Sequence, residues 1–121
     1  MSIIFTSLQD VNIGIRGFTW YAFTMDREEI ITKLQEILPI VREKYHVKTM
    51  GIFGSVARGD DTDASDVDIL VEYDIVPGFF GFIQLEKFLS DALGGRKVDL
   101  ATKKALKEVI KDDILKETIY V

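Results

Sequence analysis

The chain has 121 residues, of which 47% are apolar and 29% are charged, with 15 basic against 20 acidic side chains. This length predicts one domain, and the apolar fraction is too high for an intrinsically disordered chain. A net charge of −5 gives no broad basic surface for duplex DNA or RNA, no stretch reaches the roughly 18 apolar residues of a membrane span, and the lack of cysteine excludes disulfides, thiolate zinc sites and cysteine nucleophiles.

The first 24 residues differ in composition from the rest of the chain. They include five aromatic residues, Phe5, Phe18, Trp20, Tyr21 and Phe23. They lack the basic start and the small-residue cleavage point of a secretory signal, so we expect a cytoplasmic protein. Met25 is followed by Asp26, a residue type that caps helices. We therefore expect residues 25–121 to form the domain and residues 1–24 to be an N-terminal extension, which is either an added flap or a segment upstream of the domain.

A helical pattern of apolar residues follows Asp26. Its members recur at the spacing i, i+3, i+4 and i+7 and are Ile30, Ile31, Leu34, Ile37, Leu38 and Val41. This pattern predicts a helix to about Lys44, with Pro39 as a position at which it can kink or end.

Two strands and a polar loop come next. Residues 47–53 are short and apolar and run into Gly54 and Ser55, which predicts a strand that stops at a glycine turn, with a brief helix from Ser55. Residues 59–65 have turn composition and almost nothing to bury. In residues 67–73, four apolar positions alternate with a second set that holds Asp68, Leu70 and Glu72, which predicts a strand with two faces.

The remaining elements complete a mixed fold. The apolar residues between positions 79 and 89 predict a helix, and Gly94 and Gly95 predict its end. We expect the phenylalanines at 79, 80, 82 and 88 to lie in the core. Residues 97–101 predict a third strand. Apolar residues predict a last helix, and they are Ala105, Val109, Ile110, Ile114 and Leu115. The fold class is α/β (α+β), with a short mixed sheet that carries carboxylates and helices packed on its other side.

Three acidic side chains indicate a metal site. Asp66 and Asp68 point to the same face of their predicted strand because strand side chains alternate with period two. Two neighbouring carboxylates repel each other unless a cation neutralises them, and Mg²⁺ prefers such oxygen ligands. Asp99 lies between Val98 and Leu100, so its carboxylate faces away from that apolar pair and can join the other two acids.

The residues ahead of the acidic loop indicate phosphate binding. Gly54 allows close approach of the backbone, and the amides at a helix start can hold phosphate oxygens together with the Ser55 hydroxyl. Arg58 can add a charged contact. Three carboxylates and a phosphate-holding turn are the parts of a two-metal site for phosphoryl or nucleotidyl transfer.

Each of these residues also has a plainer interpretation. Asp66 and Asp68 can be solvent-facing acids at the start of an edge strand, and Asp99 can be a surface acid. Arg58 can pair with an acid of the neighbouring loop, at position 60, 61 or 63. The presence of Gly54 and Ser55 upstream favours metal binding for the aspartates.

The spacing of these residues resembles a known signature. Gly54 and Ser55, ten intervening residues, Asp66, one residue and Asp68 resemble the motif of the DNA polymerase beta type nucleotidyltransferases. Within that superfamily, the stretch from Asp26 to about Val121 resembles the minimal nucleotidyltransferases. The resemblance implies the nucleotidyltransferase fold, magnesium binding by Asp66 and Asp68, completion of the catalytic triad by Asp99, and phosphate binding by Gly54 and Ser55.

The resemblance also implies a partner and a reaction. Minimal nucleotidyltransferases are often antitoxins of a toxin of the higher eukaryotes and prokaryotes nucleotide-binding (HEPN) type, a helical RNase. The resemblance therefore implies AMP transfer from ATP, with two Mg²⁺ ions, to a toxin tyrosine in a type VII toxin-antitoxin system. We expect the toxin and ATP as partners, with no direct nucleic acid and no membrane.

Two alternative functions remain open at this point. One is adenylylation of a small molecule such as an aminoglycoside, against which the small size of the chain argues. The other is a non-catalytic antitoxin subunit that blocks its partner sterically and keeps the metal site only for structure.

Overall fold

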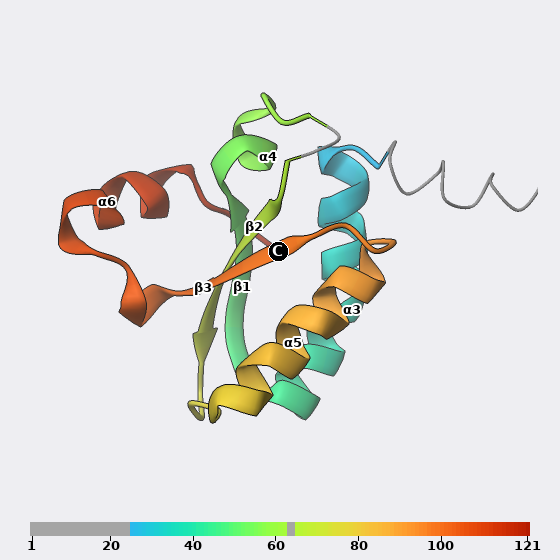
Figure 1. The fold of residues 1–121 in the computed structure, drawn as a ribbon, viewed down its shortest axis with the longest axis vertical. Coiled ribbons are helices and arrows are strands. Elements are labelled where there is room, and N and C mark those ends of the chain that lie inside the picture. Colours follow the sequence, from blue (N-terminus) through green and yellow to red (C-terminus); the bar gives the residue numbers. More distant parts are fainter. Residues whose placement is uncertain (1–24, 63–64) are drawn as a thin grey trace, which may run out of the picture.

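The structure, a computed structural model, describes residues 25–62 and 65–121 (Figure 1). In chain order its elements are α3 (Arg27–Tyr45), β1 (Val47–Phe53), α4 (Gly54–Arg58), β2 (Val67–Tyr73), α5 (Phe79–Ala92), β3 (Val98–Thr102), the 3-10 helix η1 (Lys103–Ala105), α6 (Glu108–Glu117) and β4 (Ile119–Tyr120). Our expectation for the aromatic stretch at residues 1–24 lies outside the described residues.

Helix α3 begins at a capping box. The Asp26 carboxylate accepts a hydrogen bond from the Glu29 N–H at 2.9 Å, and the Glu29 carboxylate accepts one from the Asp26 N–H at 3.0 Å. Pro39 lies inside the helix, which does not end there. The helix instead ends at His46, which takes the left-handed conformation with φ 59°.

The sheet is mixed, as predicted. Its strand order is β3-β2-β1-β4, with β2 parallel to β3 and with β1 antiparallel to both β2 and β4. The sequence predicted three of these strands but not β4, which is two residues long and has no periodicity to detect. Strand β4 can approach β1 closely because residue 51 is a glycine. A Cβ at this position would lie 2.8 Å from the Ile119 carbonyl oxygen of β4.

One face of the sheet is covered by α3 and α5, which lie side by side in Figure 1. The side chains that form this core include Ile30, Leu34 and Val41 from α3, Leu85 and Leu89 from α5, Met50 and Ile52 from β1, and Val67, Ile69 and Val71 from β2. Because strand side chains alternate, Asp68 and Leu70 point to the opposite face. The Asp68 carboxylate therefore lies on the face away from α3 and α5.

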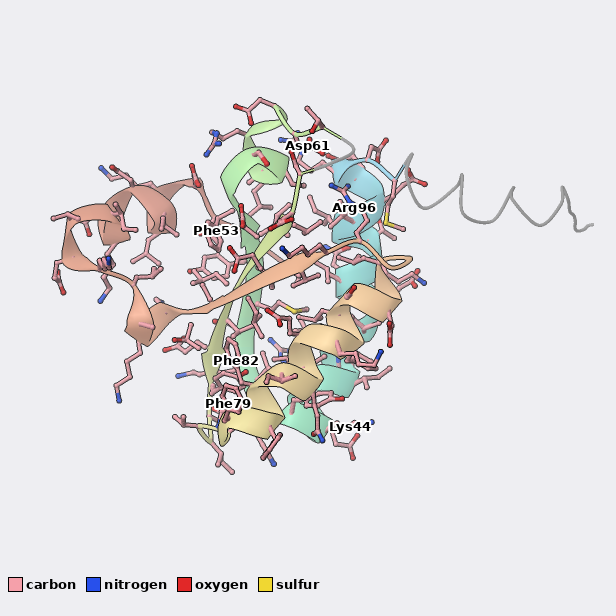
Figure 2. All side chains as sticks on the ribbon, viewed as in Figure 1. Lys44, Phe53, Asp61, Phe79, Phe82 and Arg96 are labelled. Carbon is pink, nitrogen blue, oxygen red and sulfur yellow. The ribbon has the colours of Figure 1, made fainter. Side chains whose placement is uncertain are left out.

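The prediction of a phenylalanine core in α5 is wrong for two of the four residues. Phe79 and Phe80 are 74% and 77% exposed, whereas Phe82 and Phe88 pack against the core. Figure 2 shows Phe79 at the beginning of α5, beside the ends of the strands that lie away from α4. The first turn of α5 therefore extends beyond the apolar surface that its later turns cover.

Helix α6 differs from the expectation that the helices pack on the side of the sheet away from the carboxylates. None of its residues is buried, and Val109 is 86% exposed. In Figure 1, α6 lies on the other side of the sheet from α3 and α5, so its apolar line does not join their core. Within the part of the chain that the structure describes, no helix is both long enough and apolar enough to span a membrane.

Candidate functional site

The site begins at the turn between β1 and α4. Gly54 takes the left-handed conformation with φ +72°, and a Cβ at this position would clash with the Asp68 carboxylate. Both features require glycine, the first because of the backbone and the second because of space. The turn thus places the backbone of Gly54 directly against Asp68, with Ser55 in the first turn of α4.

The strand register brings two of the predicted carboxylates together. Asp68 is the partner of Asp99 in the parallel pair β2·β3, and of Phe53 in the antiparallel pair β1·β2. Phe53 is the residue directly before Gly54. Two separate strand pairings therefore converge on Asp68, with a second carboxylate on one side and the glycine turn on the other.

The electrostatics of Asp68 reflect this crowding. Burial, followed by the charges of Asp99 and Asp66, raises the pKa of Asp68 to about 6 from its ordinary value of 3.8. The nearby Arg58 guanidinium acts in the opposite direction and lowers this pKa. Burial and two neighbouring acids thus disfavour the charged form of Asp68, and a bound cation would favour it.

The third carboxylate, Asp66, lies directly before β2. Its Oδ2 atom is 3.9 Å from the Lys97 Nζ atom, an ion pair at the surface. Asp66 and Asp99 also line an open depression of about 430 Å³ at the edge of the sheet, next to Lys97. Asp66 is therefore near the other two acids and partly neutralised by a lysine.

The donor set is compatible with magnesium. Among residues 25–62 and 65–121, no three histidine, cysteine or carboxylate side chains are already gathered around a metal position. The candidate ligands Asp66, Asp68 and Asp99 nevertheless offer only carboxylate oxygens, the donors that a hard cation prefers. Burial is the first cause of the raised pKa of Asp68, and the charges of Asp99 and Asp66, which add to it, would attract a cation to the same place.

Arg58 lies at the edge of this site. It is half-exposed, and its guanidinium binds Asp60 through Nε at 3.3 Å and Glu117 through Nη1 at 3.2 Å. These two hydrogen bonds, that to Asp60 before that to Glu117, raise the pKa of Arg58 above its ordinary value. Pairing with a loop acid was one of our interpretations for Arg58, and Asp60 fulfils it.

Glu117 is a site residue that the sequence did not reveal. Its Oε2 atom accepts a hydrogen bond from the Gly54 N–H at 2.8 Å, while its Oε1 atom accepts the one from Arg58. Gly54 and Glu117 are 63 positions apart, and their contact depends on the unpredicted strand β4. No sequence pattern marks this glutamate among the other charges of α6.

Arg96 is a second residue that the sequence did not reveal. It is 8% exposed, and its Nη2 atom donates to the Ser65 carbonyl oxygen at 2.8 Å. The same atom lies 4.0 Å from Asp61, near which Arg96 is seen in Figure 2. Arg96 thereby holds the end of the polar loop directly before Asp66.

The chain is similar to known proteins over most of its length. The family model described as "Nucleotidyltransferase domain" matches residues 34–121. Protein adenylyltransferase MntA of Thermococcus cleftensis is 43% identical over 94 residues, which cover 78% of this chain and 94% of that protein. MJ0128 of Methanocaldococcus jannaschii, assigned as a protein adenylyltransferase, is 47% identical over 96 residues, which cover 75% of this chain and 97% of that protein.

Solved structures share the fold. One assigned as a minimal nucleotidyltransferase superposes with a TM-score of 0.69 at 27% identity and covers 79% of this chain and 96% of its own. A toxin-antitoxin complex with AMP-PNP gives a TM-score of 0.56 at 22% identity, covering 78% of this chain and 70% of that one. The MntA-HepT toxin-antitoxin complex gives 0.55 at 19% identity, covering 74% and 69%.

Proposed function

The chain belongs to the nucleotidyltransferase domain family and is thus a nucleotidyltransferase, and we propose that it transfers AMP from ATP to a hydroxyl of a HEPN-type toxin. The observation that carries this proposal is the in-register pair of Asp68 and Asp99 beside the left-handed turn at Gly54. Carboxylates for a divalent cation and a turn that admits phosphates are both needed for nucleotidyl transfer.

The reaction that fits these groups is a displacement at the α-phosphorus of ATP. The acceptor oxygen forms a bond to this phosphorus, the bond to the bridging oxygen breaks, and pyrophosphate leaves with the electron pair while the hydroxyl proton passes to water. When bound by Asp66, Asp68 and Asp99, two Mg²⁺ ions would supply positive charge against the negative charge that develops on the transferred group.

The residues of the chain itself have separate roles in this proposal. Gly54 admits the phosphates because it has no side chain, and its N–H is already donated to Glu117. The Ser55 hydroxyl and the first amides of α4 orient the phosphate oxygens. Arg58 places a guanidinium beside them, close enough to the carboxylates to lower the pKa of Asp68.

A protein acceptor fits the small size of the chain. The elements that the structure describes are used to build one sheet and its helices, and they include no second domain that could enclose a small acceptor. The similar MntA is named a protein adenylyltransferase, and similar folds occur in toxin-antitoxin complexes. We therefore favour a docked protein over an aminoglycoside and place the chain in a type VII toxin-antitoxin system.

Tyrosine is the acceptor that we favour. Its hydroxyl has a pKa of about 10 in water, and a nearby divalent cation favours the ionised, nucleophilic form. The added AMP would place a negative phosphodiester near a surface that must bind RNA phosphates. Like-charge repulsion would then weaken RNA binding and neutralise the toxin.

The test is an RNase assay of the HEPN-type toxin after incubation with this protein, ATP and magnesium. We expect wild type to abolish RNA cleavage, and the double variant Asp66→Ala, Asp68→Ala to leave it intact. The double variant Asp112→Ala, Asp113→Ala is the matched control, because it removes the same charge from exposed positions of α6. Equal neutralisation by the Asp66, Asp68 variant would establish steric blocking in place of transfer.

A further inference from the structure

We propose that Glu117 is a positioning residue of the nucleotide site, which holds the Gly54 turn and aims Arg58 at the phosphates. This inference rests on the proposed function, since it assigns a role toward the nucleotide of that same site. Its basis is a bridge by one carboxylate. One oxygen of Glu117 accepts from the Gly54 N–H at 2.8 Å, and the other accepts from Arg58 at 3.2 Å.

The fold fixes Glu117 at this place. Glu117 is the last residue of α6, and two residues later Ile119 pairs with Ile52 of β1. The Val121 N–H then donates to the Met50 carbonyl oxygen at 3.0 Å. Because β1 leads directly into Gly54, this pairing carries Glu117 to the turn, and the C-terminal segment and the phosphate turn are held as one unit.

The chemistry of the bridge suits a nucleotide site. Gly54 has φ +72°, and its N–H would otherwise be free to turn with the loop, whereas the hydrogen bond to Glu117 holds it. The Arg58 side chain is about half-exposed, so without Glu117 it would keep only Asp60 as an acidic partner among the residues that the structure describes. A guanidinium that is held by two acids loses less conformational entropy when it binds a phosphate.

Charge also favours a carboxylate at position 117. Arg58 is the last residue of α4, the short helix that begins at the Gly54 turn, and its guanidinium is held there by Asp60 and Glu117. Glu117 is partly buried, with 27% of its side chain exposed, and its charge is offset by Arg58. A glutamine would keep an acceptor for the Gly54 N–H but would turn an N–H₂ group or a neutral oxygen toward Arg58.

The experiment measures binding of magnesium and AMP-PNP by calorimetry in wild type, Glu117→Gln, Arg58→Ala and the combined variant. Glu108→Gln is the matched control, since it removes the same charge from an exposed position on the same helix. We expect about a tenfold weaker Kd for Glu117→Gln and for Arg58→Ala, corresponding to one charge-assisted hydrogen bond. Glu108→Gln should stay within about twofold of wild type.

The combined variant separates positioning from a merely structural role. If Glu117 acts through Arg58, Glu117→Gln should weaken binding by at most about twofold once Arg58 is alanine. Effects that multiply, or a Glu117→Gln variant that binds as tightly as wild type or more tightly, would overturn the inference. Arg58 is exposed, so unchanged binding in Arg58→Ala would overturn it even if Glu117→Gln failed to fold. Wild type that does not bind the nucleotide would contradict the proposed function and this inference with it.

Discussion

The negative charge of Asp68, which the proposed metal site needs, destabilises the folded protein. The strand pairing places it between Phe53 and Asp99, and its pKa is raised to about 6 by burial and by the neighbouring acids. The folded state therefore binds a proton at Asp68 more tightly than the unfolded state, whose pKa is near 3.8. This stabilisation is complete below about pH 4 and is lost as the pH rises through about 6.

We accordingly expect Asp68→Asn to stabilise the metal-free protein in a pH-dependent manner. At pH 7 its Tm should exceed that of wild type by about 3–6 °C, because the amide carries no charge, and the difference should vanish near pH 4. Added magnesium should reduce the difference at pH 7 by stabilising only wild type.

Asp113→Asn serves as the control for this measurement, since Asp113 is exposed on α6. It should show no pH-dependent difference in Tm. Parallel pH profiles for wild type and Asp68→Asn, measured by thermal melts, would contradict the raised pKa.

At the scale of single residues, the sequence predicted that Gly54, Asp68 and Asp99 come together, but not the further contacts around them. The motif from Gly54 to Asp68 could be read because turns and strands have local rules. Glu117 could not be found, since its two hydrogen bonds depend on a long-range pairing of β4. Arg96 could not be found either, because burial of an arginine depends on the surrounding fold and has no local signal.

At the scale of elements, the loop between α4 and β2 is held by Arg96. Its guanidinium donates to the carbonyl oxygens of Ser65 at 2.8 Å and Met25 at 3.5 Å, and it lies 4.0 Å from Asp61. It thus joins the start of α3, the loop and the start of β3. Because the contacts come from different parts of a planar fork, a lysine cannot reproduce them.

We expect Arg96→Lys to lower the free energy of unfolding by about 2 kcal/mol, the usual penalty for leaving buried polar groups without partners. Arg42→Lys is the matched control, since Arg42 is exposed on α3, and it should change stability by less than about 0.5 kcal/mol. Urea unfolding of both variants measures these values. A loss at Arg96 no larger than that at Arg42 would show that the clamp contributes nothing.

Element boundaries were predictable where the pattern was local. The strands at Val47–Phe53 and Val67–Tyr73 and the cap at Asp26 match the sequence prediction. Periodicity predicted α6 as well but not the side of the sheet on which it lies, because it does not say which surface exists for the apolar line to cover. The same reason accounts for Phe79 and Phe80, which are apolar but exposed.

At the scale of the whole molecule, the described core forms one unit from Met25 onward. Met25 itself belongs to the core cluster, and the capping box of α3 follows it directly. The match to the nucleotidyltransferase family model begins at residue 34, and every proposed site residue lies downstream. These observations support our proposal that the domain spans residues 25–121.

A chain that starts at Met25 should therefore fold and bind nucleotide as the full chain does. Thermal melts of the two proteins, under the same buffer and concentration, measure this. We expect Tm values within about 3 °C, since Met25, the capping box at Asp26 and the core residues downstream of them are all retained. Insolubility, or a Tm lower by ten degrees or so, would show that residues 1–24 belong to the folded domain.

The most direct measurement of the central claim is the intact mass of the HEPN-type toxin after incubation with this protein, ATP and magnesium. Transfer with loss of pyrophosphate should add about 329 Da for each AMP. The variant Asp66→Ala, Asp68→Ala should add nothing, whereas Asp112→Ala, Asp113→Ala should act as wild type does. A toxin whose mass stays unchanged although the wild-type protein neutralises it would contradict adenylyl transfer as the function.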